Sequence, residues 1–225
     1  MDNELLFKQS KQYWDSKYLI AKQNMDSHQN FSPFVLIEVA SQHPLKEQKY
    51  PSDEFALRLD KAYEIYISYK NKGISVNIYV PGSRHMFNNI EDEISLSEAG
   101  INYLINKGVP KKDLLGDEKN ILYKGEDGVY NAGDECYVTS LIFKNGQYSS
   151  LICVCSVNQM PRKYLFYLEF EVIAKFYTVT SETMFHDNFI AEIFGSFNNV
   201  LYFDHSWQDP KSFIYKESRK QRKPK

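Results

Sequence analysis

The sequence contains none of the short motifs that mark the commonest nucleotide-binding and catalytic sites. It has no Gly-x-Gly-x-x-Gly fingerprint, no Walker phosphate loop, no Gly-x-Ser-x-Gly elbow and no His-Glu-x-x-His pair. The missing glycine fingerprint disfavours conventional Rossmann binding of NAD, and the missing Walker loop disfavours P-loop hydrolysis.

Cysteine and histidine are too few and too dispersed to predict a disulfide framework or a metal site. The three cysteines are an odd number, and Cys153 and Cys155 alternate within an apolar run, as expected on one face of a buried strand. The five histidines show no spacing typical of metal ligands. We therefore expect no bound metal.

Long apolar runs are also absent. No run approaches the roughly 18 apolar residues that identify a membrane-spanning helix, and the acidic start at residues 1–4 has no apolar signal-peptide core. The net charge of −2, from 27 basic and 29 acidic residues, argues against general nucleic-acid binding. The sequence predicts a soluble, cytoplasmic protein with no transmembrane segment and no nucleic-acid partner.

Positive charge is concentrated at the C-terminal end of the chain. Residues 216–225 hold six Lys or Arg and one Glu, which leaves 21 basic and 28 acidic residues in the rest. A run of this kind is typical of a disordered, solvated tail. Contact with phosphate or with a membrane surface is the alternative.

The rest of the chain alternates between strand and helix patterns. Short apolar runs predict strands at residues 34–40, 76–80, 114–115 and 151–157. Helical spacing of apolar residues predicts helices over residues 3–25, 53–71, 95–107 and 132–143. Such alternation indicates βαβ units, so we predict an α/β fold: a Rossmann-like, mostly parallel sheet with helices on both faces.

We divide the chain into four parts. They are an N-terminal helical segment (1–30), a Rossmann-like domain (31–180), a C-terminal extension of that domain (181–215) and the basic tail (216–225).

Polar residues after two predicted strands are candidate ligand contacts, because ligands of parallel sheets bind at the carboxyl ends of the strands. Gly82 allows close approach of the backbone, and the Ser83 hydroxyl and nearby N–H groups suit an anion. A plain turn is the alternative there. Gln159 and Arg162 follow the strand at 151–157, where an arginine at a helix start suits phosphate or carboxylate recognition.

Four further candidates lie in predicted helices, each with a structural alternative. Arg58 lies on an apolar helix face, where it snorkels, pairs with a carboxylate or binds a phosphate. Glu98 completes a capping box with Ser95, or it hydrogen-bonds a ligand. Asn131 and Asp134 stand at a helix start, where capping alone would explain them. Glu98 and Asp134 are the candidate catalytic residues, because catalysis requires a titratable group beside the ligand.

The order of these segments, over residues 34–170, resembles the YdcF/SanA/ElyC-like family of bacterial α/β proteins. The matching series is Arg58-Leu59-Asp60, Pro81-Gly82-Ser83, Ser97-Glu98-Ala99, Gly108-Val109-Pro110, Tyr130-Asn131 and Met160-Pro161-Arg162. The chain departs from the family in lacking a Gly-rich turn at residues 38–42 and in having Asn158-Gln159 where the family often has a His. The resemblance implies a Rossmann-like fold, and it makes S-adenosylmethionine, associated with one branch, the leading candidate cofactor.

The sequence thus predicts a YdcF-like protein that binds an anionic or nucleotide-like small molecule, with transferase or hydrolase activity left open. A non-catalytic ligand sensor or partner-binding module is the alternative. If the first prediction holds, five residues should converge on one cleft: Gly82, Ser83, Glu98, Asn131 and Arg162. The sequence predicts neither the reaction nor the oligomeric state.

Overall fold

The computed structural model describes residues 3–30, 33–84, 86–87, 90–116, 122–123, 126–127, 129 and 131–180. The predicted C-terminal extension (181–215) and basic tail (216–225) lie outside the described residues.

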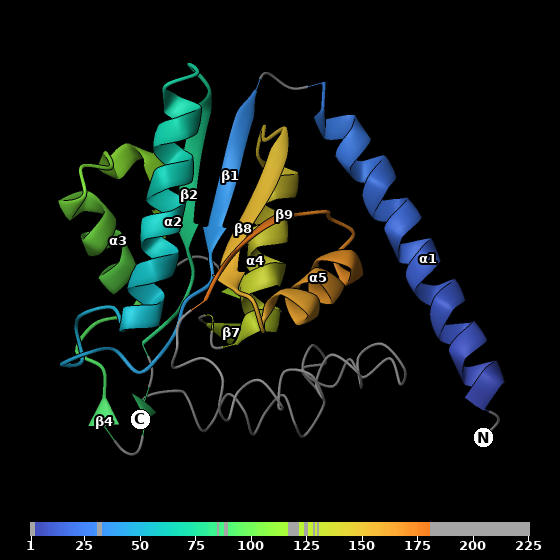
Figure 1. The fold of residues 1–225 in the computed structure, drawn as a ribbon, viewed down its shortest axis with the longest axis horizontal. Helices are drawn as coiled ribbons and strands as arrows, with labels where there is room; N and C mark the ends of the chain where they lie inside the picture. The colour runs from blue at the N-terminus through green and yellow to red at the C-terminus, as the bar shows by residue number, and fades with distance from the viewer. Residues whose placement is uncertain are drawn as a thin grey trace.

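A five-stranded parallel sheet forms the centre of the fold (Figure 1). Its strands, in spatial order, are β5 (Leu114–Gly116), β2 (Ser75–Val80), β1 (Phe34–Val39), β8 (Ser150–Ser156) and β9 (Lys175–Val179). From β1 the chain winds outward through β2 to β5, returns to β8 beside β1, and then continues to β9 at the other edge. This doubly wound order confirms the predicted α/β, Rossmann-like class.

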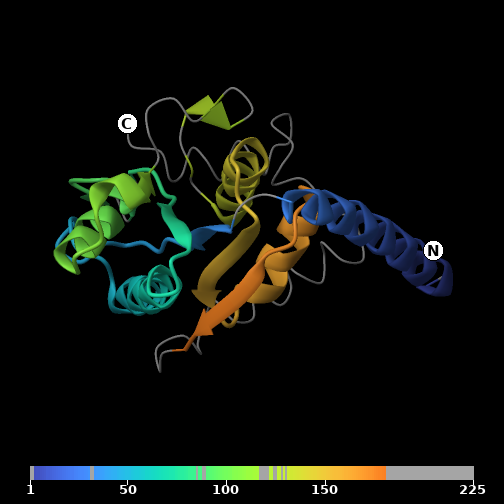
Figure 2. The same cartoon turned by 90° about the horizontal axis from the view of Figure 1, so that it is seen from above.

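Helices cover both faces of the sheet (Figure 2). One face packs against α2 (Asp53–Lys70) and α3 (Leu96–Asn106), and the other against α4 (Ala132–Asn145) and α5 (Met160–Glu169). The smaller elements are η1 (Lys111–Asp113), the pair β3 (Met86–Phe87) and β4 (Ile90–Glu91), and the pair β6 (Leu122–Tyr123) and β7 (Glu126–Asp127).

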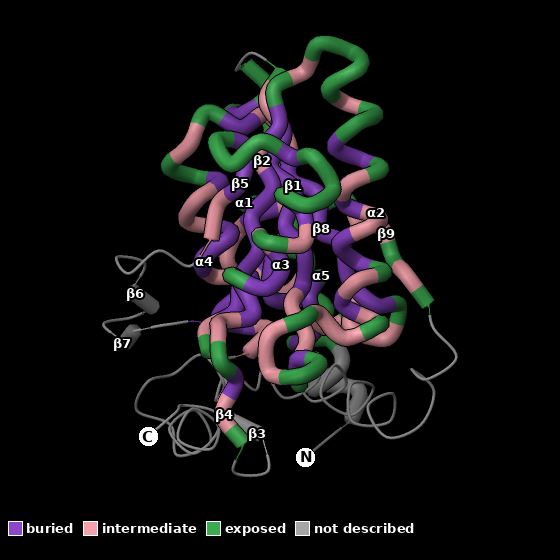
Figure 3. The backbone as a smooth tube through the Cα atoms, turned by 90° about the vertical axis from the view of Figure 1, so that its left-hand side faces the viewer, coloured by how far each residue is buried: buried purple, intermediate pink, exposed green. Residues whose placement is uncertain are grey.

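The alternation of side chains along β1 explains why helices are needed on both sides. Val35, Ile37 and Val39 belong to the core beneath α2 and α3, whereas Leu36 belongs to the core beneath α4 and α5. Both faces of the strand are therefore buried, as its nearly continuous apolar run predicts. Figure 3 shows the buried residues concentrated along the sheet and the helix faces that cover it. Glu38 is the single charged residue in this strand, and it is fully buried.

The N-terminal segment forms one helix, α1 (Asn3–His28), which runs along the α5 side of the sheet (Figure 1). The Tyr13 hydroxyl donates to Glu169 at 2.5 Å, and the His28 ring lies 3.0 Å from the Tyr148 carbonyl oxygen. These contacts attach both halves of α1 to the domain. Neither α1 nor any other described helix has the length and apolarity that crossing a membrane requires.

The sequence patterns missed β9, because the turn before it contains no glycine. After α5 the chain reverses through Glu171, whose φ is +60°, and the Val172 N–H donates to the Tyr167 carbonyl at 2.9 Å. Glycine is the residue that usually signals this kind of helix end. Without that signal, the aromatic and β-branched residues of β9 were not recognised as a strand.

Gly100 provides a test of the packing between α3 and the sheet. A Cβ there would lie 2.7 Å from Val80 Cγ1 and 3.0 Å from the Phe55 ring. We expect Gly100→Ala to lower the free energy of unfolding by about 1–3 kcal/mol in urea, because overpacking outweighs the better helix propensity of alanine. Asn102→Ala, at an exposed position of the same helix, should leave stability unchanged or slightly raised. Equal effects of the two substitutions would contradict the close packing.

Candidate functional site

The candidate site lies where β1 and β8 end side by side. The two strands are neighbours, and the chain leaves them toward opposite edges of the sheet. In open α/β sheets, ligands bind beside such a reversal, outside the carboxyl ends of the strands. Ser41 and Gln42 follow β1, and Asn158 and Gln159 follow β8, so these side chains lie where a ligand is expected.

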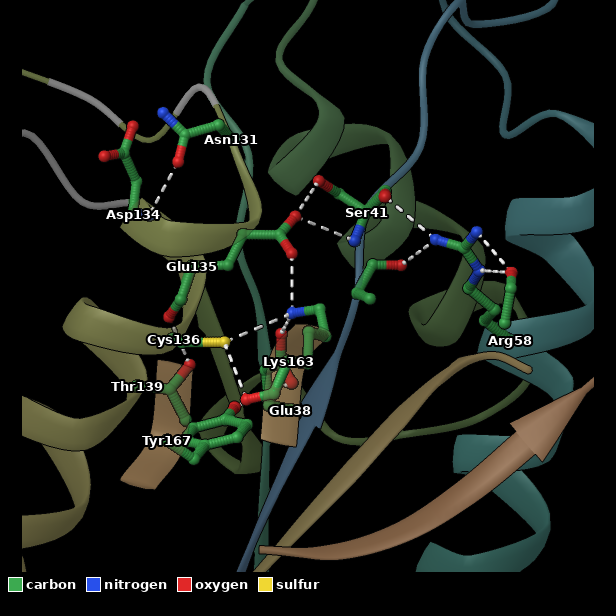
Figure 4. A network of polar contacts seen from close by, with 12 residues as sticks. Glu38, Ser41, Arg58, Asn131, Asp134, Glu135, Cys136, Thr139, Lys163 and Tyr167 are labelled. Atoms are coloured by element: carbon green, nitrogen blue, oxygen red, sulfur yellow. Dashed lines mark hydrogen bonds and ion pairs between the residues drawn. The ribbon is translucent and has the colours of Figure 1, made fainter. Parts of the chain in front are cut away.

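A buried ion network joins β1, α4 and α5 next to this edge (Figure 4). Lys163 Nζ lies 2.6 Å from Glu38 Oε1 and 2.7 Å from Glu135 Oε2, and the Lys163 side chain is fully buried. The Tyr167 hydroxyl donates to Glu38 Oε2 at 2.9 Å. Burial opposes the charged ammonium, but Cys136 and the two carboxylates around it hold the pKa of Lys163 well above its ordinary value.

Ser41 connects this network to the end of β1. Its backbone N–H and its hydroxyl both donate to Glu135 Oε1, at 3.1 Å and 2.5 Å. One oxygen of Glu135 thus faces Lys163 and the other faces Ser41 (Figure 4). The carboxylate is fixed in one orientation by groups from β1's end and from α5.

Arg58 secures the end of β1 from the opposite face. Its Nη1 donates to the carbonyl oxygens of Ala40 and Ser41, both at 2.9 Å, and its Nε donates to Ser156 Oγ at 3.0 Å. Its Nη2 donates to Gln42 Oε1 at 2.8 Å and to Glu54. Pairing with a carboxylate is therefore the alternative that the structure favours. Snorkelling is wrong, because the side chain is fully buried, and a phosphate would have to displace these partners.

The Arg58 charge also acts on its carboxylate partner. Burial alone would raise the pKa of Glu54, but the guanidinium and the hydrogen bonds from Ser156, Gln42 and Arg58 outweigh burial and hold it below its usual value. Glu54 is therefore ionised at neutral pH.

Gly82 and Ser83 lie at the same edge and are bonded into the protein. Gly82 has a φ of +121°, and a Cβ there would come within 2.8 Å of Ser41 Oγ. The Ser83 hydroxyl accepts from the Val129 N–H at 2.7 Å, and the Ser83 N–H donates to the Val129 carbonyl at 2.9 Å. Gly82 therefore permits the turn to approach Ser41, while Ser83 fastens the turn to residue 129.

Asn131 caps α4, as one of the two sequence interpretations expects. Its Oδ1 accepts from the Asp134 N–H at 3.0 Å, and Asp134 is fully buried. The other amide atom, Asn131 Nδ2, is buried and has no hydrogen-bond partner among the described residues. Capping therefore explains the position of Asn131 Oδ1 but not that of Nδ2.

The start of α5 contains two more buried amide atoms of this kind. Within the described part of the chain, Asn158 Oδ1 and Gln159 Oε1 have no hydrogen-bond partner. Buried polar atoms are normally bonded, so each exception calls for an explanation. Arg162 stands in the first turn of the same helix, half-buried, with its guanidinium 5.5 Å from the centre of the Phe166 ring.

The structure connects most of the predicted residues to this edge, with one exception. Gly82 lies against Ser41, and Ser41 bonds to Glu135 on α4, the helix that Asn131 caps. Glu135 in turn pairs with Lys163, the residue that follows Arg162 in the sequence. Glu98 differs, because its side chain is exposed in the first turn of α3 and its backbone N–H donates to Ser95 Oγ at 2.9 Å. The Ser95 half of the predicted capping box is therefore formed.

The sequence patterns did not single out Glu38, Ser41 or Lys163. A glutamate inside an apolar strand was the available signal, because it requires a buried partner. Lys163 gave a weaker signal, since a lysine among aromatic residues usually extends to solvent. No group of three or more His, Cys, Asp or Glu side chains able to hold a metal ion occurs within the described ranges.

Comparison of the chain with protein-family models, with curated proteins and with solved structures finds no match.

Lys163→Met tests the ion network. Removing the ammonium leaves two buried carboxylates without their cation, so we expect the free energy of unfolding to fall by about 3–5 kcal/mol. The control is Lys144→Met, which removes a largely exposed 3.5 Å pair with Glu171 and should cost about 1 kcal/mol or less. Similar losses in the two variants, measured by urea unfolding, would contradict a strong role for Lys163.

Proposed function

We propose that the protein binds an anionic or nucleotide-like small molecule at the carboxyl ends of β1 and β8, in the cytoplasm. The observation that supports this proposal best is the set of three buried amide atoms without partners in the described chain, on Asn131, Asn158 and Gln159. Leaving such atoms unbonded costs about 1–3 kcal/mol each. A ligand that offers both donors and acceptors would satisfy them.

The start of α5 supports an anionic group in this ligand. Helices α2, α3 and α4 each begin with a side-chain cap, and each has at least one acidic residue in its first turn. Helix α5 begins with no side-chain cap and no acidic residue, and has Pro161 and Arg162 in its first turn instead. Its N–H dipoles and the Arg162 charge would both favour an anion.

The candidate ligands follow from these two features. A nucleotide combines an anionic group with a base that both donates and accepts hydrogen bonds. S-adenosylmethionine, which the resemblance to YdcF-like proteins suggests, combines a carboxylate with the same kind of base. The ligand's carboxylate or phosphate would lie at α5, and its base would lie against the amides.

A thermal-shift experiment with purified protein tests this proposal. We expect nucleotides or S-adenosyl compounds at millimolar concentration to raise the melting temperature, because a ligand that binds the folded state stabilises it by mass action. Arg162→Ala should weaken binding by about 10–100-fold, as expected when a charged hydrogen bond is lost. Lys144→Ala, in the last turn of α4, should bind as the parent does.

Gln159→Met separates ligand binding from structural support. Removing a buried oxygen that lacks a partner should leave the free protein as stable as the parent or more stable, yet weaken ligand binding. A purely structural amide would instead lower stability when replaced. A flat response of the folded parent to both ligand classes would overturn the proposal.

A further inference from the structure

Ser41, Glu135 and Lys163 form a linear chain of hydrogen bonds that ends at the candidate ligand position. The Ser41 hydroxyl donates to Glu135 Oε1 at 2.5 Å, and Glu135 Oε2 lies 2.7 Å from Lys163 Nζ. A hydroxyl bonded to a base that a third group orients is the arrangement by which proteins activate a nucleophile. The 2.5 Å separation lies at the short end of the range for O–H···O hydrogen bonds.

Glu135 shares its cation with a second carboxylate. The Lys163 ammonium is shared with Glu38, so the three groups together carry a net charge of −1. They are almost completely buried, with side-chain exposures of 0%, 0% and 7% for Lys163, Glu38 and Glu135. Lys163 therefore does not form an exclusive ion pair with Glu135.

The position of Ser41 suits attack on a bound molecule. Its backbone carbonyl is held by Arg58 at 2.9 Å and its N–H by Glu135, so the residue is fixed from both faces of the sheet. Ser41 itself is only half-buried, unlike Glu135. The hydroxyl faces Gly82, where any larger residue would come within 2.8 Å of Oγ.

The two cations in the networks that meet at Ser41 are both paired, which favours a neutral electrophile at this hydroxyl. Phosphoryl transfer relies on cations that neutralise the transferring group, but Arg58 pairs with Glu54 and Lys163 pairs with Glu38 and Glu135. An uncharged carbonyl has no such requirement. A carboxylic ester or thioester is therefore the class of substrate that fits.

We infer that Ser41 is the nucleophile of an acyl-transfer reaction, with Glu135 as general base and Lys163 as a positioning residue. The Ser41 oxygen bonds to the carbonyl carbon while its proton passes to Glu135. The bond from that carbon to the leaving alkoxide or thiolate then breaks, and the leaving group takes the proton. Water releases the acyl group from Ser41 by the same steps. This step goes beyond the proposed binding function, which does not require it.

A neutral alkyl fluorophosphonate tests the nucleophile without a known substrate. We expect wild-type protein to gain one phosphonyl group, as the Oγ–P bond forms, fluoride leaves and the hydroxyl proton passes to Glu135. Intact mass measures the adduct, and peptide mapping should locate it on Ser41. Ser41→Ala should remove labelling, and Glu135→Gln should slow it by about 100-fold or more, as loss of a general base does.

Ser149→Ala is the matched control, because Ser149 is also half-buried but hydrogen-bonds to Phe34 at the opposite end of the sheet. The Ser149→Ala variant should be labelled on Ser41 at the same rate as the wild-type protein. Absence of labelling in folded wild-type protein, or labelling that persists in Ser41→Ala, would overturn the inference. Thermal shifts of the wild-type protein with nucleotides or S-adenosyl compounds would distinguish this failure from failure of the binding proposal, since reversible binding is measured without covalent labelling.

Discussion

A lysine ammonium buried between two carboxylates joins three elements beside the carboxyl end of β1. Lys163 comes from α5, Glu38 from β1 and Glu135 from α4, so one cation fixes three elements that are distant in sequence. Burying such groups is costly unless each is paired and hydrogen-bonded. Here Tyr167 and Ser41 supply the additional hydrogen bonds to the carboxylates. The network lies beside the place at which the strand order reverses.

A second network on the other face of the sheet complements the first. Arg58 holds the carbonyl oxygens that follow β1 and bonds to Ser156 at the end of β8. The two networks meet at Ser41, whose N–H and hydroxyl belong to one and whose carbonyl belongs to the other. The strand ends are thus immobilised by bonds within the protein. The amides of Asn131, Asn158 and Gln159 stand apart, because each keeps a buried atom that no described group satisfies.

The sequence predicted the fold better than it predicted the site, for physical reasons. Apolar runs and caps are local signals, so β1, β2, β8 and the starts of α3 and α4 were predicted correctly. Arg58 could be identified from the sequence as a candidate site residue, because a charged side chain on an apolar helix face requires an explanation. Its partner Glu54 lies four residues earlier on the same helix, but its partner Ser156 was not identifiable, since it lies 98 residues away. The bond between Glu38 and Lys163 spans 125 residues and has no local signature.

The most direct test of a ligand site at this edge of the sheet is a titration followed by the side-chain amide resonances of asparagine and glutamine. We predict that adding adenosine monophosphate or S-adenosylmethionine to ¹⁵N-labelled protein shifts the NH₂ signals of Asn131, Asn158 and Gln159. The signal of Asn102, exposed on α3, should stay in place. Shifts confined to Asn102 or to other residues remote from β1 and β8, with these three amides unmoved, would contradict a ligand site at this edge of the sheet.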